Sequence, residues 1–297
     1  MSFNQEFKNR INQAEDIIKK FLPKEEGLQQ IICEAMNYSV LGGGKRLRPV
    51  MMKATYELFG GKDDVIEPFM AAIEMIHTYS LVHDDLPAMD NDDLRRGRAT
   101  THIKYDEALA ILAGDGLLNY AFETALKAFD YDTDAKNVAK AMKVLAQKAG
   151  IYGMIGGQTV DIEAEKGRQV LDEETLLFIH KNKTAALIES SMMIGAILAG
   201  VSDDKISAVE KIAYNIGVAF QIQDDILDVI GNEEVLGKPI GSDAKNDKLT
   251  YVSLKGLQTA KEDVARLSNE AISTIKTYEK DEHFLSELTT YLIDREK

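Results

Sequence analysis

The chain has 297 residues, of which 45% are hydrophobic and 28% are charged, and its formal net charge at pH 7 is −14. This acidic balance argues against general binding to nucleic acid or to anionic membranes. The single cysteine, Cys33, excludes an intrachain disulfide and a cysteine-rich zinc site, and it is compatible with a reducing cytoplasm. The N-terminus lacks the apolar segment of a signal peptide, and no uncharged apolar run reaches the roughly 18 residues of a membrane helix. We therefore expect a cytoplasmic protein without integral membrane association.

Apolar residues recur with helical spacing along almost the whole chain, and no segment alternates with the period of two that is typical of strands. No fixed-period repeat or low-complexity linker divides the chain. The pattern predicts one all-α domain over residues 1–297. The expected helices are Phe7–Phe21, Leu28–Leu41, Pro49–Leu58, Val65–Val82, Ala108–Phe129, Lys136–Ala149, Glu173–Ala199, Asp203–Ile230, Val252–Tyr278 and Phe284–Asp294.

An acidic segment, residues 84–97, contains five aspartates within ten residues and then two adjacent arginines. Residues 71–82 before it are mostly apolar with helical spacing, and Pro87 cannot continue a regular helix, so a buried helix should end near Asp85. Carboxylates this close repel one another, and a divalent cation such as magnesium removes the repulsion. The arginines supply planar groups that grip a diphosphate. The alternative is an acidic surface loop that pairs with its own arginines.

A second acidic cluster lies within the helix expected over Asp203–Ile230. Asp224 and Asp228 are four residues apart and Gln221 precedes Asp224 by three, so these side chains share one helix face. The neighbouring residues are apolar nearly all round the helix, so acidic groups there need a cation or a cavity. Two such clusters suggest two walls of one metal site, and solvated acidic surface is the alternative.

Three basic loops separate the expected helices. Residues 42–49 form a glycine turn that brings positive charge to a helix start, an arrangement that suits an anion, although a triple glycine can serve only to stop a helix. Residues 181–184 interrupt a helical segment, and residues 237–248 follow the second acidic helix. Each loop alone is typical of solvated surface. Together with the acidic clusters, the loops predict a pocket for a metal ion and a diphosphate.

These motifs, in this order, resemble the trans-isoprenyl diphosphate synthases, and within them the bacterial farnesyl diphosphate synthases (geranyltranstransferases). The resemblance covers essentially the whole chain. Residues 77–90 resemble the first aspartate-rich motif with the two-residue insertion of the bacterial form, and residues 221–228 resemble the second. Residues 153–161 and 237–243 match further signatures. One departure is Asn91, where related bacterial sequences often carry aspartate.

The resemblance implies the isoprenoid synthase fold, in which long, mostly antiparallel helices surround a central cavity, usually in a homodimer. It implies a prenyltransferase that condenses isopentenyl diphosphate with dimethylallyl or geranyl diphosphate to farnesyl diphosphate. The steps are ionisation of the allylic diphosphate, condensation and elimination of a proton, which the released diphosphate takes. The implied cofactor is Mg²⁺, with three ions per site and Mn²⁺ as the alternative ion.

The resemblance also assigns roles to individual residues. The expected metal ligands are Asp84, Asp85, Asp90, Asp224, Asp225 and Asp228. The allylic diphosphate would be held by Arg95, Lys183, Thr184, Gln221 and Lys238, and isopentenyl diphosphate by Lys45, Arg48, His77 and Arg96. The expected catalytic residues are Asp84, Asp85, Asp90, Arg95, Lys183, Asp224 and Lys238. Without the resemblance, His77 would be interpreted as a packed core histidine.

Product length is expected to depend on Tyr79, five residues before Asp84, and on the small Ser80 beside it. Tyr79 lies roughly 7.5 Å along the helix from Asp84, but five residues also rotate the helix, so spacing alone does not place Tyr79 at the cavity. In the family, an aromatic residue here commonly forms part of the floor that stops the growing chain. The alternatives are a geranylgeranyl product, a class I terpene cyclase, and a non-catalytic subunit of a heteromeric synthase. A cyclase needs no second diphosphate site, and such subunits tend to lose an acidic motif.

Overall fold

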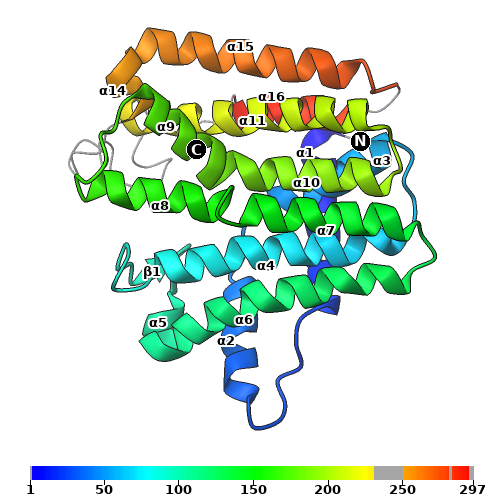
Figure 1. Cartoon of the computed structure of the whole chain (residues 1–297), viewed down its shortest axis with the longest axis vertical. Helices are drawn as coiled ribbons and strands as arrows, with labels where there is room; N and C mark the ends of the chain where they lie inside the picture. Colours follow the sequence, from blue (N-terminus) through cyan, green and yellow to red (C-terminus); the bar gives the residue numbers. More distant parts are fainter. Residues whose placement is uncertain (1, 231–249, 281–282, 294–297) are drawn as a thin grey trace. The chain divides into compact units, whose positions relative to one another are not determined.

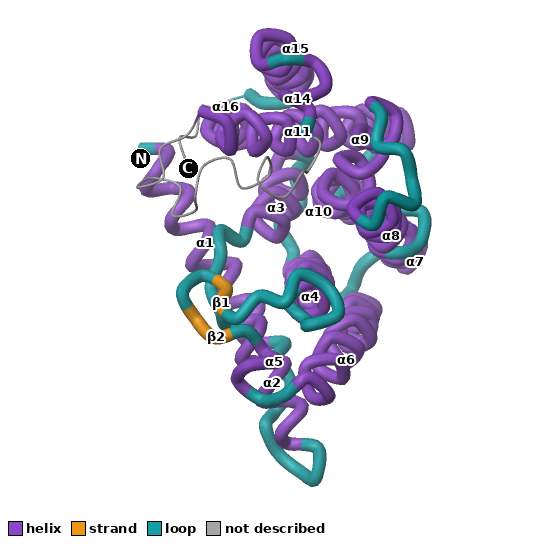
Figure 2. The backbone as a smooth tube through the Cα atoms, turned by 90° about the vertical axis from the view of Figure 1, so that its left-hand side faces the viewer, coloured by secondary structure: helices purple, strands orange, loops and turns teal. Residues whose placement is uncertain are grey.

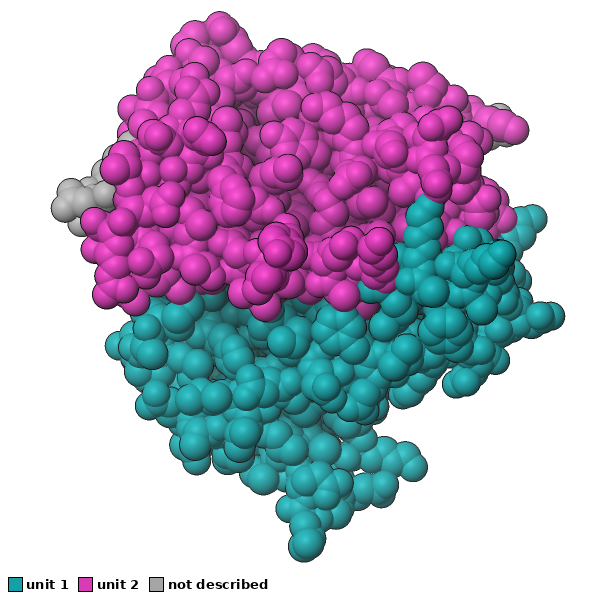
Figure 3. All heavy atoms as spheres, viewed as in Figure 1, with its two compact units in different colours: residues 1–53, 62–142 teal, residues 54–61, 143–297 magenta. Residues whose placement is uncertain are grey.

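The computed structural model describes residues 2–230, 250–280 and 283–293. Helices form almost all of its regular structure (Figure 1), which confirms the predicted all-α class. Within the described residues, the one sheet is an antiparallel ribbon of β1 (Leu94–Arg95) and β2 (Arg98–Ala99). The chain divides into two compact units, which Figure 3 colours separately: residues 1–53 with 62–142, and residues 54–61 with 143–297. No helix in the described ranges combines the length and the apolar character that a membrane span requires.

The first unit contains short and long helices together with the ribbon (Figure 2). Helix α3 continues from this unit into residues of the second, and so does α7. The elements of the first unit, in chain order, are α1 (Phe3–Lys20), α2 (Gln30–Val40), α3 (Leu47–Leu58), η1 (Asp64–Ile66), α4 (Glu67–Asp84), α5 (Thr101–Lys104), α6 (Glu107–Leu126), η2 (Lys127–Asp130) and the beginning of α7 (Ala135–Ala149).

Helix α4 carries the core of the first unit, and it lies side by side with α6 (Figures 1 and 2). Phe69, Ile73 and Ile76 of α4 are fully buried, and burial of each such side chain contributes about 1.5–3 kcal/mol. Gly114 of α6 allows the close approach, because a Cβ atom there would lie 2.0 Å from Nε2 of His83. The last turn of α4 is therefore packed firmly, and the acidic segment begins from a rigid helix.

The second unit is built around α10, in which every residue is buried, and α11, which packs against α10 and α15. Ile222 and Ile226 of α11 share one apolar cluster with Val264 and Leu267 of α15. After the end of α7, its elements are α8 (Met154–Glu165), α9 (Glu173–Ile179), the π-helix η3 (His180–Ala185), α10 (Ala186–Leu198), α11 (Asp203–Ile230), α14 (Tyr251–Lys255), α15 (Leu257–Lys276) and α16 (Phe284–Ile293).

Most predicted helices are confirmed, and the differences have local causes. Helix α8 is absent from the predicted set because adjacent glycines weaken its helical signal. One of them, Gly157, is needed for packing, since a Cβ there would lie 2.2 Å from the backbone nitrogen of Lys183. The prediction of one helix over Val252–Tyr278 is wrong, because Gly256 has φ 81° and separates α14 from α15. The predicted helix Glu173–Ala199 is interrupted by η3.

Candidate active site

The first acidic motif lies where α4 ends, as predicted. Asp84 is the last residue of α4 and Asp85 is its C-terminal cap. The following loop folds back, so that the backbone N–H of Asp90 donates a hydrogen bond to the carbonyl oxygen of Asp84 at 2.9 Å. This bond brings the backbones of Asp84 and Asp90 together, although they are six residues apart in the sequence.

Asp85 has a different environment from Asp84 and Asp90. It is buried, and Nε of Arg95 lies 2.8 and 3.0 Å from its two carboxylate oxygens. A second guanidinium nitrogen of Arg95 lies 2.6 Å from Oδ1 of Asp85. Such bidentate, charge-assisted pairs are the strong class of protein hydrogen bond. The interpretation of the motif as an acidic loop paired with its own arginines therefore holds for this pair.

Basic side chains gather around His77 on α4. Burial, followed by the nearby guanidinium groups of Arg48, Arg96, Arg95 and Arg46, lowers the pKa of His77 well below its ordinary value. The pKa of Arg48 is lowered to about 10, mainly by burial, which Glu74 opposes and Arg96 reinforces. A cavity beside α4 is lined by His77 and by all the arginines of the β-ribbon. His77 is thus neutral at pH 7 within a concentration of positive charge, which is an environment for an anion.

The glycine loop, residues 41–46, joins α2 to α3. Gly43 and Gly44 have φ values of 85° and 138°, and a Cβ at Gly44 would lie 2.7 Å from Nη1 of Arg96, so this turn requires glycine. Lys45 is exposed, and Arg48 is half-buried in the first turn of α3. The loop therefore stops α2 and also places cations at the start of α3, as the sequence predicts.

Residues with unusual backbone conformations lie in the glycine loop and in the acidic segment, residues 84–97. Among the described residues, the non-glycine residues with positive φ are Arg46 (48°), Asn91 (55°) and Arg96 (53°). Such conformations cost about 1–3 kcal/mol each and persist where the surrounding structure imposes them. They belong to the glycine loop, to the acidic loop and to the turn of the β-ribbon.

The second acidic motif lies on α11, in the second unit. The amide nitrogen of Gln221 donates to Oδ2 of Asp224 at 3.0 Å, which confirms the predicted common face for these two residues. The hydroxyl of Thr184 donates to Oε1 of Gln221 at 2.8 Å, and so links η3 to α11. Lys183 of η3 donates to Oδ2 of Asp161, on α8, at 2.5 Å. Single π-helical turns such as η3 are frequent at functional sites. This turn contains Lys183 and Thr184, which the resemblance assigns to the allylic diphosphate.

Asp225 is satisfied by the protein itself. Its Oδ2 accepts a hydrogen bond from the backbone N–H of Tyr251 at 2.7 Å, at the start of α14, and lies 3.8 Å from Nε2 of His180. Asp225, which the resemblance assigns as a metal ligand, therefore has a backbone donor as a partner. Asp224 and Asp228 are half-buried on the same helix.

The predicted chain-length residues lie on the last turns of α4. Tyr79 is 6% exposed, and its ring meets the ring of His83 edge to face, with centroids 5.8 Å apart. Its hydroxyl has no hydrogen-bond partner among the described residues, and burial, with a smaller contribution from Asp84, raises the pKa of Tyr79 to about 12. Ser80 donates its hydroxyl to the carbonyl oxygen of His77 at 2.9 Å. The predicted ligand Lys238 and the rest of its loop lie outside the described residues.

The donors of both motifs suit a hard cation. No group of three or more His, Cys, Asp or Glu side chains within the described part of the chain forms a complete metal site. Magnesium does not need one, because it binds through one or two carboxylates and completes its shell with water and substrate phosphates. Asp84 at the end of α4 and Asp90 in the loop beyond it are carboxylates of the required kind, and so are Asp224 and Asp228 of α11.

Several residues at these sites are not among those predicted. Asp161 holds Lys183, and Tyr251 and His180 hold Asp225. The sequence contained a signal for Asp161, which ends the 153–161 signature. It also contained a signal for Glu74, because a charged residue within an apolar helix needs a buried partner.

Comparisons with known proteins agree with these observations. The polyprenyl synthetase family model matches residues 29–289. The chain is 42% identical to farnesyl diphosphate synthase of Micrococcus luteus over 297 residues, which cover 100% of this chain and 98% of that protein. It is 43% identical to geranylgeranyl diphosphate synthase of Cyanophora paradoxa over 287 residues, covering 95% and 93%. Its structure matches that of Helicobacter pylori geranyltransferase, which was solved in complex with magnesium and isoprenyl diphosphate. That match has a TM-score of 0.82 and 32% identity, and covers 99% of this chain and 97% of the other.

Proposed function

Because the chain belongs to the polyprenyl synthetase family and is therefore a prenyltransferase, we propose that it condenses isopentenyl diphosphate with dimethylallyl or geranyl diphosphate to farnesyl diphosphate. One observation carries the proposal: four arginines surround the neutral His77 on the helix that ends in the acidic loop. This arrangement supplies an anion site next to carboxylates that suit a metal ion. We further propose that residues 1–297 act as one domain, in a cytoplasmic homodimer. The family match, which includes residues of both compact units, supports the single domain.

Each basic group has a proposed partner. Lys45, Arg48, His77 and Arg96 hold isopentenyl diphosphate, and Arg95, Lys183, Thr184 and Gln221, with Lys238, hold the allylic diphosphate. His77 is held neutral, so it acts as a hydrogen-bond donor and not as a cation. The groups of the allylic site would stabilise the charge that grows as the allylic diphosphate departs, and preorganised donors of this kind lower the barrier.

The proposed cofactor is magnesium, with three ions per site and manganese as the substitute. Asp84 and Asp90 of the first motif and Asp224 and Asp228 of the second would hold it, with Asp85 and Asp225 as the remaining predicted ligands. Magnesium, when bound, neutralises charge on the departing diphosphate. The magnesium complex of the H. pylori relative supports this choice. No histidine or carboxylate stands out as the base of the last step, so the proton leaves with the released diphosphate.

Product length is the finer part of the proposal. The buried ring of Tyr79, one turn and a half before the acidic loop, supports a floor that stops the product at fifteen carbons. Geranylgeranyl diphosphate is the second candidate, because synthases of both products are relatives at similar identity. The test is to incubate the purified protein with isopentenyl diphosphate, magnesium and each allylic diphosphate, and to separate the products by chromatography.

We expect a fifteen-carbon product from the wild type and longer products from Tyr79→Ala. A twenty-carbon wild-type product would refute the farnesyl assignment. An unchanged distribution in the variant would move length control to another residue. A product formed from the allylic substrate alone would indicate a cyclase, and absence of product would indicate a non-catalytic subunit.

A further inference from the structure

Arg46 lies between two proposed substrate-binding residues, Lys45 and Arg48, but its side chain points into the protein. That side chain is only 3% exposed, and its backbone adopts the left-handed conformation with φ 48°. An arginine cannot lose its charge at ordinary pH, so a buried one must be paired. Lys45, the residue before it, is exposed. Arg46 is therefore built for a different task from its neighbours.

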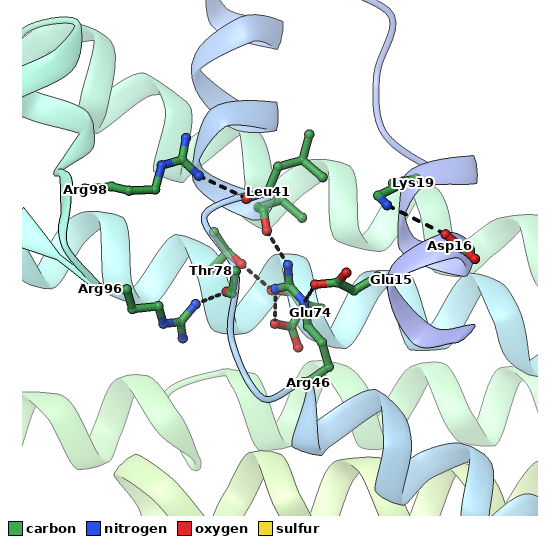
Figure 4. Close-up of polar contacts among 11 residues, drawn as sticks. Glu15, Asp16, Lys19, Leu41, Arg46, Glu74, Thr78, Arg96 and Arg98 are labelled. Carbon is green, nitrogen blue, oxygen red and sulfur yellow. Dashed lines mark hydrogen bonds and ion pairs between the residues drawn. The ribbon is translucent and has the colours of Figure 1, made fainter. Parts of the chain in front are cut away.

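The guanidinium group of Arg46 joins the loop to three helices (Figure 4). Its Nη1 donates to Oε1 of Glu74 on α4 at 2.7 Å, and the Glu74 side chain is 4% exposed. Its Nη2 donates to the carbonyl oxygen of Val40, the last residue of α2, at 2.8 Å. Its Nε lies 3.6 Å from a carboxylate oxygen of Glu15 on α1. The position of Arg46 is thus determined from several directions.

The β-ribbon holds the same loop from the other side. Arg96 donates to the carbonyl oxygen of Gly43, and Arg98 donates to that of Leu41 at 3.0 Å (Figure 4). The last carbonyl groups of a helix have no partner within the helix, and α2 ends at Val40. Arginine side chains supply these missing donors and are favourable at a helix C-terminus. The loop is therefore fixed by its carbonyl groups, with Arg46 as the buried contact.

Stability alone does not account for a buried arginine–glutamate pair. Well-packed apolar residues of similar volume are often as stable as such a pair or more so. The pair does supply directional hydrogen bonds that apolar residues lack. Glu74 also counteracts the lowering of the pKa of Arg48 by burial. The hydrogen bonds fix the loop that carries Lys45, and the charge of Glu74 acts on Arg48 at the start of α3.

We propose that Arg46 and Glu74 form a positioning pair for the isopentenyl diphosphate subsite. Neither residue contacts the substrate. Together they fix the backbone from which Lys45 and Arg48 extend, so that both cations are in place before the substrate arrives. The proposal rests on the proposed function, since it deepens the assignment of that subsite. It concerns the acceptor substrate and leaves the allylic substrate to other residues.

The test separates position from stability by comparing two variants. Glu74→Gln leaves a buried arginine without its counter-ion, so it should lower both the melting temperature and the affinity for isopentenyl diphosphate. The double variant Arg46→Met/Glu74→Leu removes both charges and fills the space, so its melting temperature should recover. In both variants we expect the KM for isopentenyl diphosphate to rise on the order of tenfold, a change of about 1.4 kcal/mol. We expect kcat and the allylic KM to stay within about threefold of wild type, less than 0.7 kcal/mol.

A matched control is Glu189→Gln. Glu189 is also a buried glutamate on an apolar helix, α10, and its partner is Lys148. This variant should lower the melting temperature and leave the KM for isopentenyl diphosphate unchanged. An equal rise in that KM would show general destabilisation and overturn the proposal. A wild-type KM in a stable double variant would overturn it as well.

Calorimetric titration with isopentenyl diphosphate gives a readout that does not require turnover. The wild type should bind, and both Glu74 variants should bind on the order of tenfold more weakly. If the wild type neither binds isopentenyl diphosphate nor forms product, the proposed function fails and the positioning pair fails with it. If the wild type binds and turns over while the variants bind equally well, only the positioning pair fails.

Discussion

The two acidic motifs hold their aspartates by different means. In the first, α4 ends and a loop folds back, so a backbone hydrogen bond brings Asp90 to Asp84. In the second, α11 continues without a break, and helical spacing alone puts Asp224 and Asp228 on one face. A loop site needs support from elsewhere in the fold, whereas a helix carries its own geometry. Among the described residues, two non-glycine residues with positive φ, Asn91 and Arg96, lie in the segment of the first motif, whereas Gln221 on the same helix donates to Asp224 in the second.

The motifs also share a feature. Each begins with two adjacent aspartates, and in each the second aspartate is bound by the protein. Arg95 grips Asp85, and the backbone N–H of Tyr251 donates to Asp225. The second aspartate of each pair thus links two elements of the structure, and we predict that it contributes more to stability than the first. This division of roles can be tested by mutation.

The largest effect is expected from the first aspartates. Asp84→Ala and Asp224→Ala should each lower kcat at least about a hundredfold, because each removes a proposed ligand of the metal ion that would neutralise the departing diphosphate. Steady-state kinetics with both substrates would measure this. Circular dichroism should show unchanged helical content, which keeps a folding defect from explaining the loss. Near-normal activity in both variants would contradict a site that uses both motifs.

A smaller loss of activity, but a larger loss of stability, is expected from the second aspartates. Asp85→Asn and Asp225→Asn keep the side-chain shape but weaken the bonds to Arg95 and to Tyr251. Each should lower the free energy of unfolding by about 1–3 kcal/mol. Chemical denaturation would measure the loss, with the double variant Asp85→Asn/Arg95→Gln to show whether the pair is coupled. The division of roles is wrong if either variant is as inactive as Asp84→Ala while fully stable.

The two basic loops, residues 42–49 and 181–184, should also differ in the substrate that they serve. Lys45→Ala, and likewise Arg48→Ala, should raise the KM for isopentenyl diphosphate by about 10–100-fold. Lys183→Ala, beside the second motif, should instead raise the allylic KM, because Lys183 belongs to the proposed allylic site. Kinetics with one substrate varied at a time would separate the effects. The reverse pattern would mean that the two subsites are exchanged.

The smallest effect is expected from pH. The pKa of His77 is lowered from its ordinary 6.5 by burial and by the arginines near the first motif, so the folded protein leaves His77 neutral where the unfolded chain takes up a proton. The free energy of unfolding is therefore unaffected by His77 protonation above about pH 6.5, and it decreases as the pH falls below that value. Between pH 7.5 and 5.5, the melting temperature should fall about 2–4 °C more in wild type than in His77→Gln. Equal slopes would show that His77 titrates normally.

Features that depend on local spacing could be predicted from the sequence. The apolar period predicted the helices, and Pro87 correctly ended α4 near Asp85. The separation of Gln221 from Asp224 correctly predicted their common face. The glycines of residues 42–44 correctly marked the end of α2 and the turn before α3. These features depend only on the geometry of a single helix or turn, so the spacing of residues along the chain is enough to predict them.

Which charged groups neutralise one another could not be predicted from the sequence, because it depends on how the elements pack. Arg46 and Glu74 are separated by 28 residues, and Tyr251 and Asp225 by 26. No period in the sequence links the members of such a pair, because they lie on different elements. The packing of the glycine loop on α4 joins the first pair, and the packing of α14 on α11 joins the second. The close approach of Gly157 to the π-helical turn arises in the same way. Hydrogen bonds and ion pairs act over a few ångströms, so residues far apart in the sequence can form them only where folding brings them close together.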